Sequence, residues 1–244
     1  MNKERNGFTL VELLVVIGIL GILMSALFPA ITSAMLSAQT QALSQHGRNL
    51  YIGITQANVD RESHGRESVW PKAKNADASG TGDDIAYKSY SSSADDYFDD
   101  LFDMTKYGST DWSPYVDVDI KFCSGAGVGA YKGGNTLKGC IAWKIVVDLT
   151  DNMPDVIPVL VSRNISTDSF AKSGTLDTLS QTKQLPVDST YTQPFGNKAS
   201  VVVHKGGAVG VFKGRYQSLC DIYDKQTIAF VGESQIDYLK PSNK

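Results

Sequence analysis

The sequence predicts an α+β protein in which a long N-terminal helix packs on a mainly antiparallel β-sheet head domain, with the first half of the helix crossing a membrane. The first observation behind this prediction is an apolar run from Phe8 to Ile31, and the second is helical spacing that continues to about Ile54. The third is a set of short runs rich in β-branched residues in the second half of the chain. We divide the chain into a leader over 1–7, a membrane helix over 8–31, an amphipathic continuation over 32–58 and an α+β head domain over 59–244.

The apolar run is long enough to cross a bilayer. It spans 24 residues, interrupted only by Thr9, Glu12 and Ser25. As a helix it measures roughly 36 Å, against about 30 Å for a hydrocarbon core. A carboxylate inside such a run is costly, which makes Glu12 a candidate functional residue with a partner to be found.

Charge around the run predicts its orientation. Lys3 and Arg5 precede it, and the next basic residue is Arg48. The positive-inside rule therefore places the N-terminus in the cytoplasm and the rest of the chain outside. A cleaved secretory signal is disfavoured, because the apolar core is too long and no Ala-x-Ala site closes it. An ordinary signal-anchor helix, with Glu12 reaching toward the headgroups, remains the alternative.

The start of the run resembles the leader junction of type IV pilins and type II secretion pseudopilins, on the residues Gly7-Phe8-Thr9-Leu10-Val11-Glu12. The resemblance implies that a membrane peptidase cleaves between Gly7 and Phe8, that Phe8 is N-methylated, and that Glu12 is the carboxylate of the motif. Pro29 lies where many members carry a helix-loosening proline. Residues 47–54 also resemble the second half of this helix in G-type major pseudopilins.

The resemblance implies a structural, non-enzymatic subunit of a helical homo-oligomeric filament, the pseudopilus of type II protein secretion. Its partners would be the prepilin peptidase/methylase, the inner-membrane secretion machinery and other pseudopilins. The protein would be a single-pass inner-membrane protein with its head in the periplasm. We hypothesise that Glu12 pairs with the Phe8 ammonium of a neighbouring subunit and so sets the axial register. A type IV pilus subunit with an adhesive or binding head is the alternative, and a membrane-tethered enzyme is a third, less favoured class.

Small and apolar residues at helical spacing carry the helix past Pro29 to about Ile54. Gly47 inside the helix costs roughly 1 kcal/mol of helix stability, so a break in the helix at Gly47 is the alternative.

Residues 60–90 are rich in Ser, Gly, Asp and Lys, which predicts a long loop. Residues 93–104 have apolar pairs one turn apart and an acidic first turn, which predicts a short amphipathic helix.

The remaining elements of the head are predicted as strands. A hairpin is expected where Lys205-Gly206-Gly207 separates two apolar runs, and an edge strand is expected near the C-terminus. The predicted strands are Val116–Cys123, Gly139–Leu149, Val156–Ser162, Val201–His204, Ala208–Phe212 and the edge strand Thr227–Val231.

Three cysteines lie in the part predicted to be outside, where disulfides persist. Cys123 and Cys140 enclose 16 residues, six of them glycine. A bridge between them would constrain this loop by about 3 kcal/mol, and we predict that pairing with Cys220 buried. The absence of any bridge is the alternative.

Other chemistry is weakly supported. The formal net charge of −3 disfavours nucleic-acid binding. The segment Gly125-x-Gly127-x-x-Ala130 lacks the helix that a dinucleotide-binding turn needs. The three histidines, His46, His64 and His204, lie in different predicted elements and are interpreted as surface or turn residues.

One loop has the oxygen donors of a calcium site at alternate positions, namely Asp77, Ser79, Asp83 and Asp84. Major pseudopilins, as a family, hold calcium in a loop of the head, so the resemblance implies Ca2+ as the one candidate cofactor. A solvated loop is the competing interpretation.

Overall fold

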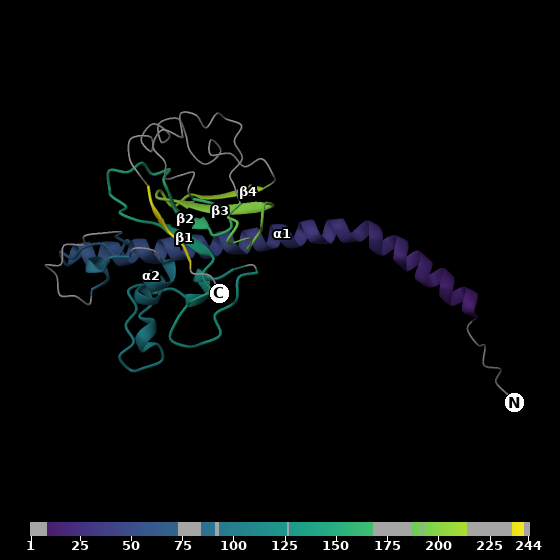
Figure 1. Cartoon of the computed structure of the whole chain (residues 1–244), viewed down its shortest axis with the longest axis horizontal. Helices are drawn as coiled ribbons and strands as arrows, with labels where there is room; N and C mark the ends of the chain where they lie inside the picture. The colour runs from purple at the N-terminus through teal and green to yellow at the C-terminus, as the bar shows by residue number, and fades with distance from the viewer. Residues whose placement is uncertain are drawn as a thin grey trace. The chain divides into compact units, whose positions relative to one another are not determined.

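The computed structural model describes residues 9–72, 84–90, 93–125, 127–167, 187–191, 193–213 and 236–241. It confirms the α+β class, with a long helix and a five-stranded sheet (Figure 1). The chain divides into two compact units, one ending at Gln39 and the other beginning at Thr40, and the long helix contributes to both.

Helix α1 spans Leu10–Ser63, nine residues beyond the predicted end at Ile54, and Pro29 lies inside it. Gly65 has φ +67° and ends the helix. Its N–H bonds the Glu62 carbonyl, and the Arg66 N–H bonds the Arg61 carbonyl, at 3.0 and 2.9 Å. This is a Schellman cap, which needs a left-handed residue that glycine adopts without strain.

The head is built on a sheet with strand order β4-β3-β2-β1-β5, antiparallel at every pairing. Its strands are β1 Trp143–Val146, β2 Pro158–Ser162, β3 Ala199–His204, β4 Val209–Lys213 and β5 Tyr238–Leu239. The predicted hairpin is confirmed as β3 and β4, with Gly207 at φ +78° in its turn. The short strand β5 was not predicted, and the predicted edge strand Thr227–Val231 lies outside the described residues.

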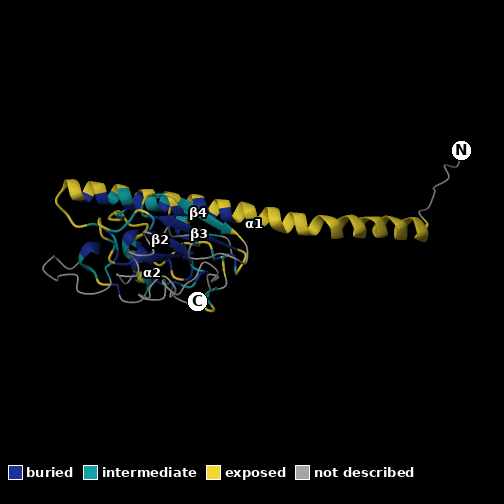
Figure 2. Ribbon diagram, turned by 90° about the horizontal axis from the view of Figure 1, so that it is seen from above, coloured by how far each residue is buried: buried dark blue, intermediate teal, exposed yellow. Residues whose placement is uncertain are grey.

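Both faces of the central strands are covered, since every residue of β1, β2 and β3 is buried. The second half of α1 lies along one face of the sheet (Figure 2). On this face Gly47 lies against the Trp143 ring. Side chains alternate along a strand, so Lys144 projects to the opposite face. There its ammonium donates to the Ile165 carbonyl and to Asp188, at 2.7 and 2.5 Å.

Short helices complete the described part of the head. Helix α2, Ala94–Leu101, lies within the predicted helical segment and packs against β1. The 3-10 helices are η1 Ile85–Tyr87, η2 Met104–Lys106 and η3 Ile120–Cys123. Of these, η1 falls in the segment that we predicted as a loop.

The predicted strand Val116–Cys123 is wrong, because its second half is the helix η3 and its first half is not in a strand. Asp119 caps this helix: its side chain accepts a hydrogen bond from the Lys121 N–H at 2.9 Å. Alternating valine and aspartate imitated a half-buried strand, but a capping aspartate starts a helical turn instead. The predicted strand Gly139–Leu149 is shorter than expected and reduces to β1.

Candidate functional site

The helix N-terminus holds Glu12 in a defined local structure. Oε2 of Glu12 accepts hydrogen bonds from both the backbone N–H and the hydroxyl of Thr9, at 2.9 and 2.8 Å. In return the Glu12 N–H donates to the Thr9 hydroxyl at 3.3 Å. This reciprocal pattern is a capping box, which satisfies donors that a helix start leaves without partners.

The capping box uses one carboxylate oxygen. Both Thr9 donors go to Oε2, and the part of the chain that the structure describes offers no hydrogen bond to Oε1. The carboxylate can therefore cap its own helix and still accept a donor from another chain. The role of Thr9 was not predicted, although the spacing Thr9-x-x-Glu12 is the signature of a capping box. The predicted processing residues Gly7 and Phe8 lie outside the described residues.

The first part of α1 has an uncovered apolar surface. This part of the helix is exposed on every side (Figure 2). Its large apolar side chains are exposed as well, for example Leu10 at 86% and Phe28 at 69%. Soluble monomers rarely expose contiguous apolar surface of this extent. Among the described residues, α1 is the one helix long and apolar enough to cross a membrane.

Polar groups inside this apolar stretch are satisfied within the helix. The Ser25 hydroxyl donates to the Ile22 carbonyl at 2.8 Å, and the Thr32 hydroxyl donates to the Pro29 carbonyl at 2.9 Å. A hydrocarbon environment requires such internal pairing, because it offers no water to polar groups. The stretch is therefore suited to lipid or to packing among similar helices.

Comparison with protein-family models gives one match at this end of the chain. Residues 2–28 match the prokaryotic N-terminal methylation motif. This motif, on a long apolar helix, supports a type IV pilin-like subunit that is processed as a prepilin and anchored in a membrane. Neither the search of curated proteins nor the search of solved structures gave a match.

The predicted disulfide is not formed in the structure, where Cys123 and Cys140 are free thiols. Backbone hydrogen bonds already hold the loop between them. The Ala142 N–H binds the Cys123 carbonyl at 2.8 Å, and turns close at Val128 and Cys140. Burial, with the nearby Asp99 and Cys140, raises the pKa of the Cys123 thiol, which disfavours its reactive thiolate. Cys220 lies outside the described residues.

The predicted calcium loop is described only at Asp84, because Asp77, Ser79 and Asp83 lie outside the described residues. The side chain of Asp84 caps η1 and forms an ion pair with Arg61 at 2.8 Å. Burial opposes its ionisation, but the hydrogen bond and charge of Arg61 lower the pKa of Asp84 overall. Asp84 is therefore engaged by a cation of the chain itself.

The histidines do not come together. His46 and His204 each bind a backbone carbonyl through Nδ1, that of Ser124 at 2.8 Å and that of Val156 at 2.6 Å. His64 is exposed near Asp60. We expected surface or turn positions, and this was wrong for His204, which is buried in β3. Burial lowers the pKa of His204, so it packs as a neutral side chain.

Proposed function

We propose that the chain is a pilin-like structural subunit of a type II secretion pseudopilus. Cleavage between Gly7 and Phe8 and N-methylation of Phe8 would give the mature subunit, which polymerises through α1. The observation that carries this proposal is the methylation motif at the start of a helix whose apolar side chains are exposed. A prepilin peptidase/methylase, the inner-membrane secretion machinery and other pseudopilins would be its partners.

The proposed membrane topology follows from charge. Lys3 and Arg5 precede the apolar run and would stay in the cytoplasm, which leaves the head in the periplasm. Cleavage after Gly7 would create an ammonium at Phe8 near the membrane. Such a group needs an anionic partner in a setting of low polarity.

Glu12 supplies that partner in the proposed filament. Its Oε2 holds the capping box, and its Oε1 would accept the Phe8 ammonium of the neighbouring subunit. The pair would offset the burial cost of both charges and fix the axial register between helices. Pairing with the Phe8 ammonium requires a negative charge on residue 12, whereas the capping box requires only an oxygen that accepts hydrogen bonds.

Substitutions at Glu12 separate the two roles. Glu12→Gln keeps an oxygen that can cap the helix but removes the charge, and Glu12→Ala removes both. We expect both variants to insert and to be cleaved, as shown by membrane fractionation and by the mass of the mature N-terminus, but to form no filaments in sheared fractions. Thr9→Ala is the matched control, which loses the capping hydroxyl and keeps the charge, and it should still assemble. Normal filaments from Glu12→Gln would refute the register role.

A type IV pilus subunit with a binding head is the second candidate. It is favoured by an open, polar cavity of about 690 Å3 in the head, lined by residues that include Arg61, Asp103 and Tyr115. Filament length in electron micrographs distinguishes the two candidates, because pili are long and secretion pseudopili are short.

A further inference from the structure

The head has a second cavity, smaller than the polar cavity described above, between the last turns of α1 and the turns that follow β1 and β3. Its volume is about 510 Å3, which is within the range of small-molecule sites. We call it the Trp70 cavity. Its lining includes Tyr51, Asn58 and Glu62 from α1, and Trp70, Asp151 and Lys205 from other segments.

A notch of about 150 Å3 adjoins the Trp70 cavity, and the two share Trp70 and Leu149. The apolar part of the notch consists of these two residues and Pro71. An apolar cavity of about 150 Å3 can hold a group the size of benzene. The notch therefore has room for one apolar side chain of a ligand.

Carboxylates outnumber basic groups around the Trp70 cavity and its notch. The acids that line them are Glu62, Glu67, Asp148 and Asp151, and the bases are Arg66, Lys72 and Lys205. The surplus is one negative charge, which favours a cationic ligand over an anionic one.

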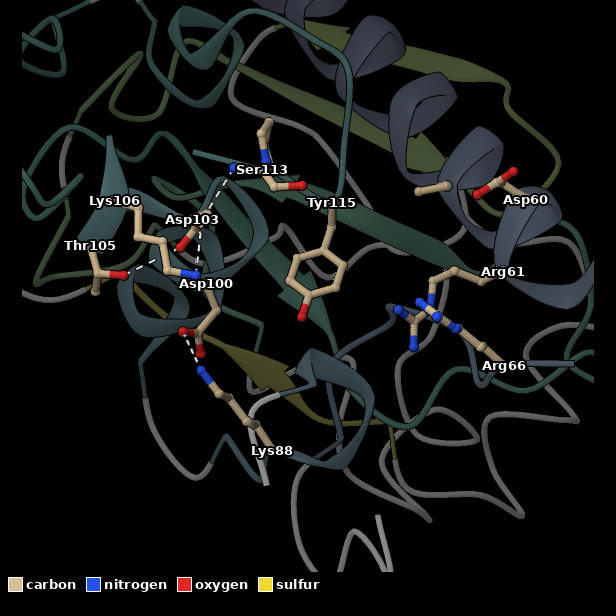
Figure 3. Close-up of a pocket in the computed structure, with 12 residues that line it drawn as sticks. Asp60, Arg61, Arg66, Lys88, Asp100, Asp103, Thr105, Lys106, Ser113 and Tyr115 are labelled. Carbon is tan, nitrogen blue, oxygen red and sulfur yellow. Dashed lines mark hydrogen bonds and ion pairs between the residues drawn. The ribbon is translucent and has the colours of Figure 1, made fainter. Parts of the chain in front are cut away.

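The larger cavity is balanced instead (Figure 3). Its bases are Arg61, Arg66, Lys88 and Lys106, and the carboxylates that line it or pair with its lining are Asp60, Asp84, Asp100 and Asp103. Its charge therefore selects neither a cation nor an anion, whereas that of the Trp70 cavity does.

Two carboxylates of the Trp70 cavity are available to a ligand. The side chains of Glu62 and Asp151 are exposed and have no hydrogen bond or ion pair among the described residues. The Lys205 ammonium is directed to the backbone instead, where it donates to the carbonyls of Asp151 and Met153 at 2.6 Å each. The Arg66 guanidinium is uncommitted in the same part of the chain, so two available carboxylates face one available base.

Two aromatic rings form one corner of the cavity. The ring centroids of Tyr51 and Trp70 lie 6.3 Å apart, with their planes inclined by 38°. The Tyr51 hydroxyl donates to the Lys205 carbonyl, which fixes that ring against the hairpin turn. Aromatic faces attract cations electrostatically, so this corner and the carboxylates favour the same kind of ligand.

A buried amide supplies hydrogen-bond donors. Asn58 lines the cavity and is only 8% exposed. Its Oδ1 accepts a hydrogen bond from the Val69 N–H at 2.8 Å, whereas its Nδ2 has no partner among the described residues. The indole N–H of Trp70 is also without one there. Because buried amides are normally hydrogen-bonded, these donors call for acceptors from a ligand, such as peptide carbonyl oxygens.

We propose that the Trp70 cavity binds an extended segment of another protein that carries a basic residue near an apolar one. The basic group lies against Glu62 and Asp151, the backbone carbonyls accept from Asn58 and Trp70, and the apolar side chain occupies the notch. A neutral sugar fits less well, because it offers the available carboxylates no cation. This site does not depend on filament assembly, so its failure would leave the proposed function intact.

The test is isothermal titration of the full chain in detergent micelles at pH 7 and low salt. The probe is a pentapeptide of alanine, acetylated and amidated at its ends, with leucine at the second position and arginine at the fourth. Residues two apart in an extended peptide lie on the same face, so both side chains can reach the site. The companion peptides replace arginine by its neutral isostere citrulline, arginine by glutamate, or leucine by alanine, and maltotriose is the sugar probe.

We expect saturable binding of the arginine peptide. The citrulline peptide should bind at least tenfold more weakly, which corresponds to about 1.4 kcal/mol. The peptide without leucine should also bind more weakly, and the glutamate peptide and maltotriose should not bind. Equal affinity for any companion peptide, or no saturable binding of the arginine peptide, would overturn the proposal. Binding of maltotriose without binding of the arginine peptide would assign the cavity to a sugar and would also overturn it.

Variants locate the binding. The double substitution Glu62→Gln and Asp151→Asn removes both available charges and should weaken binding of the arginine peptide at least tenfold. Asp155→Asn is the matched control, because Asp155 is an exposed acid of the same turn region that does not line the cavity, and it should bind as the wild type does. Both changes are at exposed positions, so the head should stay folded. Unchanged affinity in the double variant would show that the peptide binds elsewhere and would refute the site.

Discussion

Replacing Gly47 by alanine sets two physical effects against each other. Gly47 lies inside α1, where alanine is the better helix former by about 1 kcal/mol. A Cβ at this position would lie 2.6 Å from Cη2 of Trp143 and 2.8 Å from Cγ2 of Val203. Carbon atoms pack best at about 3.5–4.0 Å, so the added methyl overlaps both neighbours by roughly 1 Å.

Neither neighbour can move at low cost. Trp143 and Val203 are fully buried, and the Trp143 indole N–H donates to the Phe122 carbonyl at 3.0 Å. Tilting the ring would strain that bond, and lifting α1 would open the core. Overpacking of a core costs about 1–3 kcal/mol, and two rigid neighbours place this site near the upper end. After the gain in helix propensity, Gly47→Ala should lower the free energy of unfolding of the head by about 2 kcal/mol.

The measurement is urea unfolding of the full chain in micelles, monitored by tryptophan fluorescence. Differences in the free energy of unfolding are taken from the transition midpoints, with one m-value used for all variants. Gln56 is exposed on the same helix, so Gln56→Gly against Gln56→Ala measures the intrinsic preference for alanine without a clash. That pair should differ by about 1 kcal/mol in favour of alanine. If Gly47→Ala proves as stable as the wild type, the close packing of α1 on the sheet is wrong.

Two further predictions concern buried groups. Burial opposes ionisation of Asp188, but the hydrogen bond and charge of Lys144 lower the pKa of Asp188 overall. The ionised carboxylate therefore stabilises the folded head above about pH 4, and this stabilisation is lost on further acidification. Asp188→Asn should lower the free energy of unfolding by about 3 kcal/mol at pH 7, because it leaves the fully buried Lys144 ammonium without its carboxylate. In urea titrations the difference in free energy of unfolding between the variant and the wild type should decrease between pH 5 and pH 3. A difference that does not change with pH would contradict the ion pair. Half-buried Cys140 should react with maleimide in the native chain and buried Cys123 only after unfolding, as read by peptide mass mapping. Labelling of both only after reduction would establish the bridge instead.

Local signals predicted the elements that local chemistry determines. The hairpin of β3 and β4 follows from two β-branched runs around a glycine turn, and α1 follows from its apolar run and helical spacing. The end of α1 depends on contacts distant in the chain. Asn58 accepts a hydrogen bond from the Val69 N–H at 2.8 Å, and Arg61 pairs with Asp84. These polar residues carry the helix to Ser63 through tertiary bonds, which composition alone could not indicate.

The candidate sites also differ in whether local sequence or tertiary contacts determine them. The capping box at Thr9 and Glu12 is a contact across three residues and could have been predicted from spacing. The polar cavity of the head is lined by residues at the end of α1 and by residues between Lys88 and Tyr115, and these segments meet only in the folded head.

The exposed helix explains why a single carboxylate matters for the proposed assembly. Apolar side chains on the first part of α1 favour entry into a membrane, each contributing about 1.5–3 kcal/mol when fully buried. Inside the membrane they give neighbouring helices little reason to associate, because lipid tails are as apolar as leucine. Association at a fixed register must then come from close packing and from polar pairs. Glu12 is the one charged residue from Phe8 to Ile31, and its capping box leaves an oxygen for another chain, so the sequence offers no other anion for this role along that stretch.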